Sequence, residues 1–157
     1  MEALALFQMK LKSHLLLLCR KIIQERLRVA EEVITAAQAS ANEESKSSAG
    51  DKYETGRAMA QLEIEKASGQ LAEARKLIMS LDQITVGETS DVIRLGSLVY
   101  TNQGNYFLSI PVGELVVEGI SYYALSPASP LGAGLVGQRA GAAVRVNQRE
   151  IKVSRVE

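Results

Sequence analysis

The sequence has few of the residues that stabilise a fold through disulfides or metal ions. It contains one cysteine, Cys19, and one histidine, His14, among 157 residues. One cysteine cannot form an internal disulfide, and a zinc site needs more His or Cys ligands than His14 and Cys19 supply. We therefore expect Cys19, which lies in a leucine-rich segment, to be a small buried hydrophobic residue rather than a nucleophile.

Long apolar runs are also missing. The longest, residues 15–19, lies between Lys12 and Arg20 and is far shorter than the roughly 20 residues that cross a bilayer. No basic flank precedes the first apolar residues and no small-residue cleavage site follows Cys19, so we expect no signal peptide. Together with the lone cysteine, this pattern predicts a cytoplasmic protein that does not contact a membrane.

The formal net charge is zero, but the charges are unevenly distributed. Residues 1–28 carry six basic and two acidic residues, a net charge of +4, whereas residues 29–54 carry two basic and six acidic residues, a net charge of −4. The polarity could orient the chain on a charged partner. The basic stretch 10–28 could also contact nascent RNA, but it has no aromatic residue for base stacking, which favours a solvated helix face.

Two proline-free segments show helical periodicity. Apolar residues recur at alternating spacings of three and four, which places them on one stripe of each helix. The first stripe contains Ile23, Leu27, Ala30, Ile34, Ala37 and Ala41, and the second contains Ala60, Ile64, Ala67, Leu71, Ala74, Ile78 and Leu81. The pattern predicts an antiparallel two-helix coiled coil over residues 1–85, with an acidic tip at residues 43–55 and a slender, alanine-rich seam.

The pattern changes after residue 85. Short runs rich in Val, Ile, Leu and Tyr, bounded by Gly, Asn, Ser or Pro, predict strands at 92–95, 98–101, 106–110, 115–117, 143–146 and 151–156. Residues 102–105 and 147–148 predict hairpin turns, and residues 133–136 predict a short helix. We expect Tyr122 and Tyr123 in the core or at the edge of the sheet. The fold class is therefore α+β, with a small antiparallel β domain at residues 89–157.

Motifs in both parts resemble one known family. Residues 50–55, Gly-Asp-Lys-Tyr-Glu-Thr, are similar to the tip pattern Gly-Asp-Leu-Ser-Glu-Asn of Gre-type transcript cleavage factors of bacterial RNA polymerase. Val92, Gly96, Ser97 and Val99 are similar to the first strand of that family's C-terminal domain. The family signature Ser-Pro-Leu-Gly-x-Ala-Leu-x-Gly-x-x-x-Gly-Asp-x-Val is matched by Ser126, Pro127, Pro130, Leu131, Gly132, Leu135, Gly137, Gly141 and Val144.

The resemblance covers nearly the whole chain and implies both a fold and a function. It implies a C-terminal domain that is FKBP-like, and a transcription elongation factor that binds in the secondary channel of RNA polymerase. There Asp51 and Glu54 would help hold a second Mg²⁺ and stimulate cleavage of the backtracked RNA 3′ end. The chain would be an accessory factor rather than an enzyme. It would have no cofactor in isolation, would use the Mg²⁺ of the polymerase active site, and would be a monomer.

The tip departs from the family pattern. Lys52 and Tyr53 replace Leu and Ser between the two carboxylates, and Glu43 and Glu44 add negative charge nearby, so these four residues are candidate contacts with the polymerase. One alternative is a Gre-like regulator that occupies the channel and inhibits or modulates polymerase without cleavage. Another is an interaction module for a different partner. A further interpretation assigns Asp51 and Glu54 to the capping of the second helix.

Overall fold

The structure is a computed structural model. It describes the backbone of residues 2–44 and 50–157, and the side chains of residues 2–43 and 54–157. The two long helices are α1 (Glu2–Glu44) and α2 (Gly50–Asp82). The chain divides into two compact units, one formed by Met1–Lys21 together with Met79–Glu157 and the other by Ile22–Ile78. In the described part of the chain, no helix is long and apolar enough to cross a membrane.

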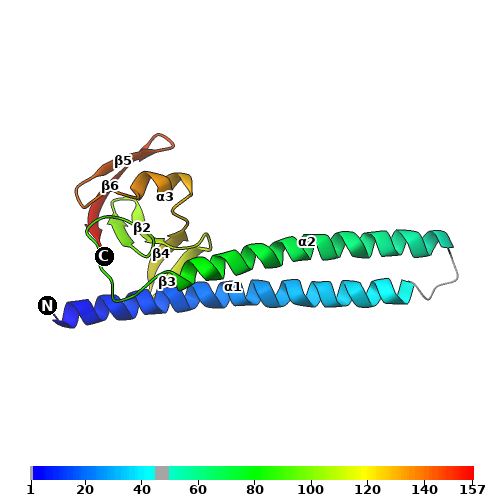
Figure 1. The fold of residues 1–157 in the computed structure, drawn as a ribbon. Helices are drawn as coiled ribbons and strands as arrows, with labels where there is room; N and C mark the ends of the chain where they lie inside the picture. Colours follow the sequence, from blue (N-terminus) through cyan, green and yellow to red (C-terminus); the bar gives the residue numbers. More distant parts are fainter. Residues whose placement is uncertain (1, 45–49) are drawn as a thin grey trace. The chain divides into compact units, whose positions relative to one another are not determined.

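The unit Ile22–Ile78 is a helical hairpin whose seam follows the predicted stripes. Figure 1 shows α1 and α2 side by side through this unit. Its four most buried alanines are Ala30, Ala37, Ala67 and Ala74, each 4% exposed or less. The larger seam residues Leu27, Ile34, Ile64 and Leu71 are half-buried. The small alanine side chains let the two backbones approach closely, and the predicted two-helix packing is confirmed.

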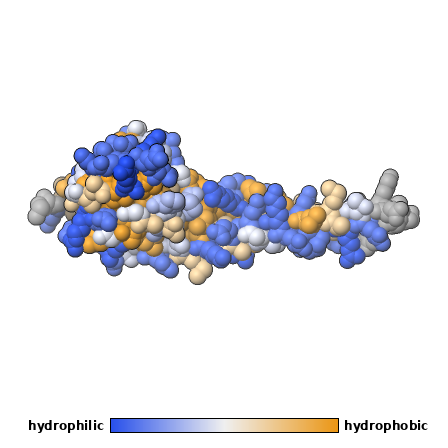
Figure 2. All heavy atoms as spheres, turned by 90° about the horizontal axis from the view of Figure 1, so that it is seen from above, coloured by the Kyte–Doolittle hydropathy of each residue, from blue (hydrophilic) through white to orange (hydrophobic). Residues whose placement is uncertain are grey.

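The outer surface of this hairpin is mostly polar. Arg28 forms ion pairs with Glu25 and Glu32, and all three residues lie on one face of the helix. The distance from Arg28 Nη2 to Glu25 Oε1 is 2.5 Å. Figure 2 shows hydrophilic side chains over most of the visible face, interrupted by small apolar patches. Among the described side chains of this unit, the large exposed apolar residues are Val29, Val33, Met59 and Leu62. Scattered exposed apolar residues of this kind are normal on a protein surface.

The other unit contains a six-stranded sheet. Its elements are β1 (Leu98–Thr101), β2 (Gly104–Leu108), β3 (Gly113–Val117), β4 (Ile120–Leu125), α3 (Pro130–Leu135), β5 (Ala143–Val146) and β6 (Arg149–Val156). The strand order is β3-β4-β2-β1-β6-β5. Only the β2–β4 pair is parallel among the strand pairs of the described chain. The predicted α+β class, with a mainly antiparallel sheet and a short helix, is confirmed.

Both predicted hairpin turns are present. Thr101 pairs with Gly104 across the first turn, where the Thr101 hydroxyl donates to the Gly104 carbonyl over 2.8 Å. Across the second, Val146 pairs with Arg149. The intervening Asn147 and Gln148 have φ values of 50° and 67°, the left-handed conformation that a two-residue turn with the right twist requires.

One predicted strand is absent, and one observed strand was not predicted. Residues 92–95 form no strand, because Ile93 bonds to the loop after α3: its N–H donates to Gln138 O over 2.9 Å and its carbonyl accepts from Gly137 N over 2.8 Å. Strand β4 was not among the predicted strands. It pairs with β3 through a tight turn at Glu118 and Gly119, both with positive φ, and lies inside the sheet rather than at its edge.

The predicted short helix begins three residues earlier than expected. Ser129 caps α3 by accepting a hydrogen bond from Gly132 N over 3.0 Å, and Pro130 occupies the first helical turn. A serine cap followed by proline is a favourable helix start, because proline has no N–H to leave unsatisfied. Leu135 at the end of α3 is fully buried in a core cluster with Ile93, Val99, Leu108, Val144 and Val153.

The start of α1 also belongs to the core of this unit. Leu11 is 6% exposed, and Leu15 and Cys19 are fully buried. Cys19 Sγ lies 3.9 Å from Ser109 Oγ, and Gln8 donates to Glu157 Oε1 over 2.9 Å. Arg20 pairs with Asp82 near the end of α2, with 2.8 Å between Nη1 and Oδ1. The first five turns of α1 therefore cover part of the sheet unit.

Candidate functional site

The acidic residues of the predicted tip lie around the junction of the two helices. α1 ends at Glu44 and α2 begins at Gly50, so Glu43 and Glu54 lie at the same end of the hairpin. Both of these side chains are exposed. Positions 51 and 54 are three apart within α2 and share a helix face. The side chains of Glu44, Asp51, Lys52 and Tyr53 lie outside the described residues.

The local sequence explains why the helix begins here. Asp51 and Glu54 fall in the first turns of α2, where carboxylates interact favourably with the positive end of the helix dipole. Ser48 stands three residues before Asp51, the spacing of a capping box, but it lies outside the described residues. Helix stabilisation and a role in a partner's site are compatible, because both depend on the negative charge at this end.

The surface beside Glu54 is hollowed and lined mainly by polar side chains, but few of them are carboxylates. A hollow of about 420 Å³ is lined by Glu54, Arg57, Ala58 and Gln61. Within the described chain, no group of three or more His, Cys, Asp or Glu side chains is placed to hold a metal ion. A Mg²⁺ ion prefers octahedral oxygen ligands and usually keeps several waters, so one or two carboxylates are a partial site that a partner would complete.

The basic stretch 10–28 is mostly a solvated helix face, as the sequence favoured, and Lys12 is the exception. Lys12 is only 4% exposed, because it lies three residues before the fully buried Leu15 and shares its helix face. Arg20 and Arg28 are engaged in ion pairs with Asp82, Glu25 and Glu32. Lys10 and Lys21 are exposed, as expected.

The interpretation of Cys19 as a buried hydrophobic residue is confirmed. Its side chain is fully buried, and burial raises the pKa of the thiol to about 11. A nucleophilic or metal-binding cysteine needs the thiolate form, which this environment disfavours. His14 is exposed on α1.

The C-terminal signature residues build the fold. A Cβ atom at Gly132 would lie 2.1 Å from the Ser126 carbonyl oxygen, so only glycine fits there. The Ser129 hydroxyl donates to the same carbonyl over 2.6 Å, while Ser126 Oγ accepts from Ala128 N. Gly137 and Gly141 both have φ above 80°. These positions secure the turn into α3 and the turns that follow it.

Comparison with known proteins identified no relative of this chain. No protein-family model matches the chain, and neither a curated protein nor a solved structure matches it significantly. The similarity to Gre-type factors therefore rests on the motifs in the sequence. The structure adds a helical hairpin with acidic residues at its helix junction and a six-stranded sheet unit.

Proposed function

We propose that this chain is a transcription elongation factor that enters the secondary channel of bacterial RNA polymerase and stimulates cleavage of backtracked RNA. The observation that supports the proposal best is the helical hairpin with acidic residues at its helix junction. A side chain at such a junction can reach into a partner's cavity, since only two helices need to enter.

The dimensions of the hairpin suit this role. Residues 22–44 of α1 run about 34 Å at 1.5 Å per residue. The buried alanines Ala30, Ala37, Ala67 and Ala74 keep the two helices close together. A long and narrow element of this kind can enter a channel that excludes a globular domain.

The proposed chemistry is two-metal phosphoryl transfer. Asp51 and Glu54 would supply hard oxygen ligands to a second Mg²⁺, whose other ligands come from the polymerase active site and the RNA. The metal would orient a water for attack on the phosphodiester near the RNA 3′ end. In this proposal the chain acts in the cytoplasm as a monomer, and its FKBP-like sheet unit contacts the polymerase at the channel mouth.

A second candidate is a channel-occupying regulator that inhibits without cleavage. The specific observation in its favour is the sequence between the carboxylates, where Lys52 and Tyr53 replace the small and apolar residues of the family pattern. The exposed Glu43 adds an acidic side chain that such a regulator could use.

The test is an in vitro transcription assay on stalled, backtracked complexes of bacterial RNA polymerase. The cleavage factor should release short 3′ RNA fragments and return the complexes to elongation. Binding without fragment release, together with slower elongation, would favour the inhibitory regulator. A chain that neither binds polymerase nor changes either rate would contradict both candidates and favour a different partner.

A further inference from the structure

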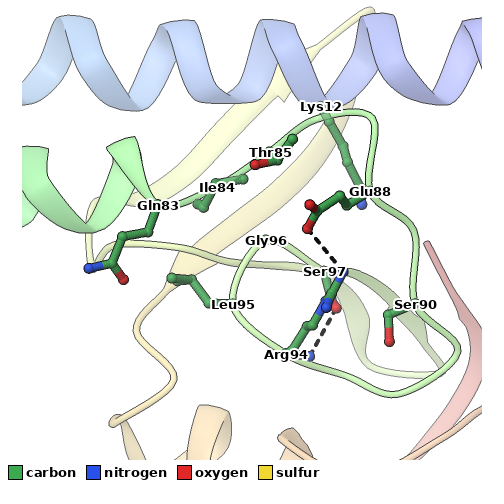
Figure 3. A pocket seen from close by; sticks show the side chains of 10 residues that line it. All are labelled: Lys12, Gln83, Ile84, Thr85, Glu88, Ser90, Arg94, Leu95, Gly96 and Ser97. Atoms are coloured by element: carbon green, nitrogen blue, oxygen red, sulfur yellow. Dashed lines mark hydrogen bonds and ion pairs between the residues drawn. The ribbon is translucent and has the colours of Figure 1, made fainter.

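A cavity in the sheet unit is lined by two basic, one acidic and three hydroxyl side chains, together with an amide and apolar residues. It has a volume of about 230 Å³ and lies between α1 and the loop that follows α2. Figure 3 shows Lys12 reaching from α1 toward the side chains of Glu88 and Arg94, with Ser97 beside Arg94. All of these residues belong to the same compact unit.

Lys12 is a largely buried residue whose ammonium has no close anionic partner. The residue is 4% exposed, and no hydrogen bond or ion pair within 4 Å joins its ammonium to the described side chains. Glu157 attracts the ammonium from a greater distance, but Gln8, Tyr100 and Arg155 already bond that carboxylate. No fully buried side-chain nitrogen or oxygen in the described chain lacks a hydrogen-bond partner, so this ammonium keeps contact with solvent, where an anion can reach it.

Arg94 brings a second positive charge to the cavity. It lies close enough to Lys12 to lower the pKa of that lysine, although burial is the larger cause. Its pair with Glu88 is long, at 3.5 Å between Nη2 and Oε2, and both side chains are more than half exposed. An exposed pair with this geometry is weak, so a stronger anion can displace Glu88 from Arg94.

Ser97 supplies a buried hydroxyl. It is 3% exposed, and its oxygen accepts a hydrogen bond from Arg94 N over 2.9 Å. No acceptor for the Ser97 hydroxyl proton is found among the described residues, so this proton can be donated to a ligand. Lys12, Arg94 and Ser97 thus present donors to one small space, and two of the three are almost fully buried.

We propose that this cavity binds a phosphate group, with Lys12 and Arg94 balancing its negative charge and Ser97 donating to one of its oxygens. A phosphate offers several acceptor oxygens and up to two negative charges, which matches two cations and a hydroxyl better than a single carboxylate does. The volume is below the roughly 300 Å³ at which pockets for drug-sized ligands begin, so the site suits an ion or a terminal phosphate.

The test is a calorimetric titration of the full chain with inorganic phosphate, with chloride as the balancing salt at constant ionic strength. Wild-type protein should bind one phosphate saturably. Lys12→Met and Arg94→Gln should each weaken binding by about tenfold or more, since each removes a charge-assisted bond. Lys10→Met is the matched control, because it removes an exposed charge from the same helix. It should change affinity less than about twofold.

Adenosine 5′-monophosphate and adenosine, titrated in parallel, distinguish the sources of the phosphate. Tighter binding of the nucleotide than of inorganic phosphate identifies a nucleotide or RNA end as the ligand, and equal or weaker binding identifies the free ion. Binding of adenosine as tightly as the nucleotide would overturn the proposal, because it would not depend on the phosphate. So would the absence of saturable phosphate binding at millimolar concentration, or equal losses in Lys10→Met and Lys12→Met.

Discussion

Lys12 links stability to binding at the scale of a single residue. Burial, opposed by Glu157 and reinforced by Arg94, lowers the pKa of its ammonium in the folded chain. The unfolded chain then binds the proton more readily than the folded chain. Folding stability should therefore increase as the pH rises from the lowered folded pKa toward the ordinary value of 10.5.

Replacing this charge should stabilise the empty protein. In phosphate-free buffer at neutral pH, we expect Lys12→Met to raise the free energy of unfolding by about 1 kcal/mol, because it removes a partly desolvated charge and keeps the apolar stem. Urea denaturation measures the change. The exposed Lys10→Met should stay within about 0.5 kcal/mol of wild type. A clear loss of stability in Lys12→Met would contradict this interpretation of Lys12.

Cys19 gives an independent residue-scale prediction. Since burial raises the pKa of its thiol to about 11, the native protein should react very slowly with an aromatic disulfide reagent at pH 7.5. Complete reaction is expected once urea unfolds the chain. Rapid, complete reaction in native buffer would show that the thiol is accessible, and would place the start of α1 outside the core.

Replacing two helical glycines by alanine should change the folding stability in opposite directions. Gly69 lies within α2, and a Cβ atom added there would have no neighbouring atom within 4 Å, so Gly69→Ala should raise stability by about 1 kcal/mol. Gly132 lies against the Ser126 carbonyl, so Gly132→Ala should lower stability by about 1–3 kcal/mol. Thermal unfolding of both variants tests this, and changes of the same sign would contradict the described packing.

The elements differ in how well the sequence predicts them. The hairpin could be predicted because its seam repeats over many turns, and every seam residue from Ile23 to Ala41 is buried or half-buried. Strand β1 was predicted with its observed bounds. Residues 92–95 have strand composition but bond to the loop after α3, a tertiary contact that local sequence does not specify. The turn at Glu118 and Gly119 gave a weaker signal than the Asn-containing turns, so β4 was missed.

The two candidate sites, the tip and the cavity at Lys12, also differ in how well the sequence predicts them. The positions of Glu43 and Glu54 at one end of the hairpin follow from the helix pattern, whereas the roles of Asp51 and Glu54 come from the resemblance. The cavity at Lys12 could not be predicted, because Lys12 and Arg94 are distant in sequence and meet only in the folded unit. The available signal was spacing: Lys12 stands three residues before Leu15 and seven before Cys19, so it lies on the same helix face as these buried residues.

At the scale of the whole molecule, the length of the hairpin should matter for the proposed function. Ala30 and Ala74 line the same groove, so residues 30–36 and 68–74 lie opposite one another in the two helices. Deleting both segments removes seven residues from each helix, preserves the seam pattern and shortens the hairpin by about 10 Å.

This deletion is a sharper test than truncation after residue 82, which would expose the buried Leu11, Leu15 and Cys19. We expect the shortened chain to fold and to bind polymerase, but to lose stimulated RNA cleavage, because the tip no longer reaches the active site. Polymerase pull-down and the fragment-release assay measure the two properties. Full cleavage by the shortened chain would contradict delivery of the tip by the hairpin.

The central claim is that the tip carboxylates act in the polymerase active site. The most direct measurement is the rate of 3′ RNA fragment release from backtracked complexes with Asp51→Asn, Glu54→Gln and the control Glu63→Gln, an exposed acidic residue away from the tip. The two tip variants keep the side-chain shape and lose the charge that would help hold Mg²⁺. We predict normal polymerase affinity with abolished cleavage for both tip variants, and unchanged cleavage for Glu63→Gln. Wild-type cleavage by the tip variants, with only about 0.5–1 kcal/mol lost from folding stability, would show that the carboxylates serve α2 alone and would contradict the claim.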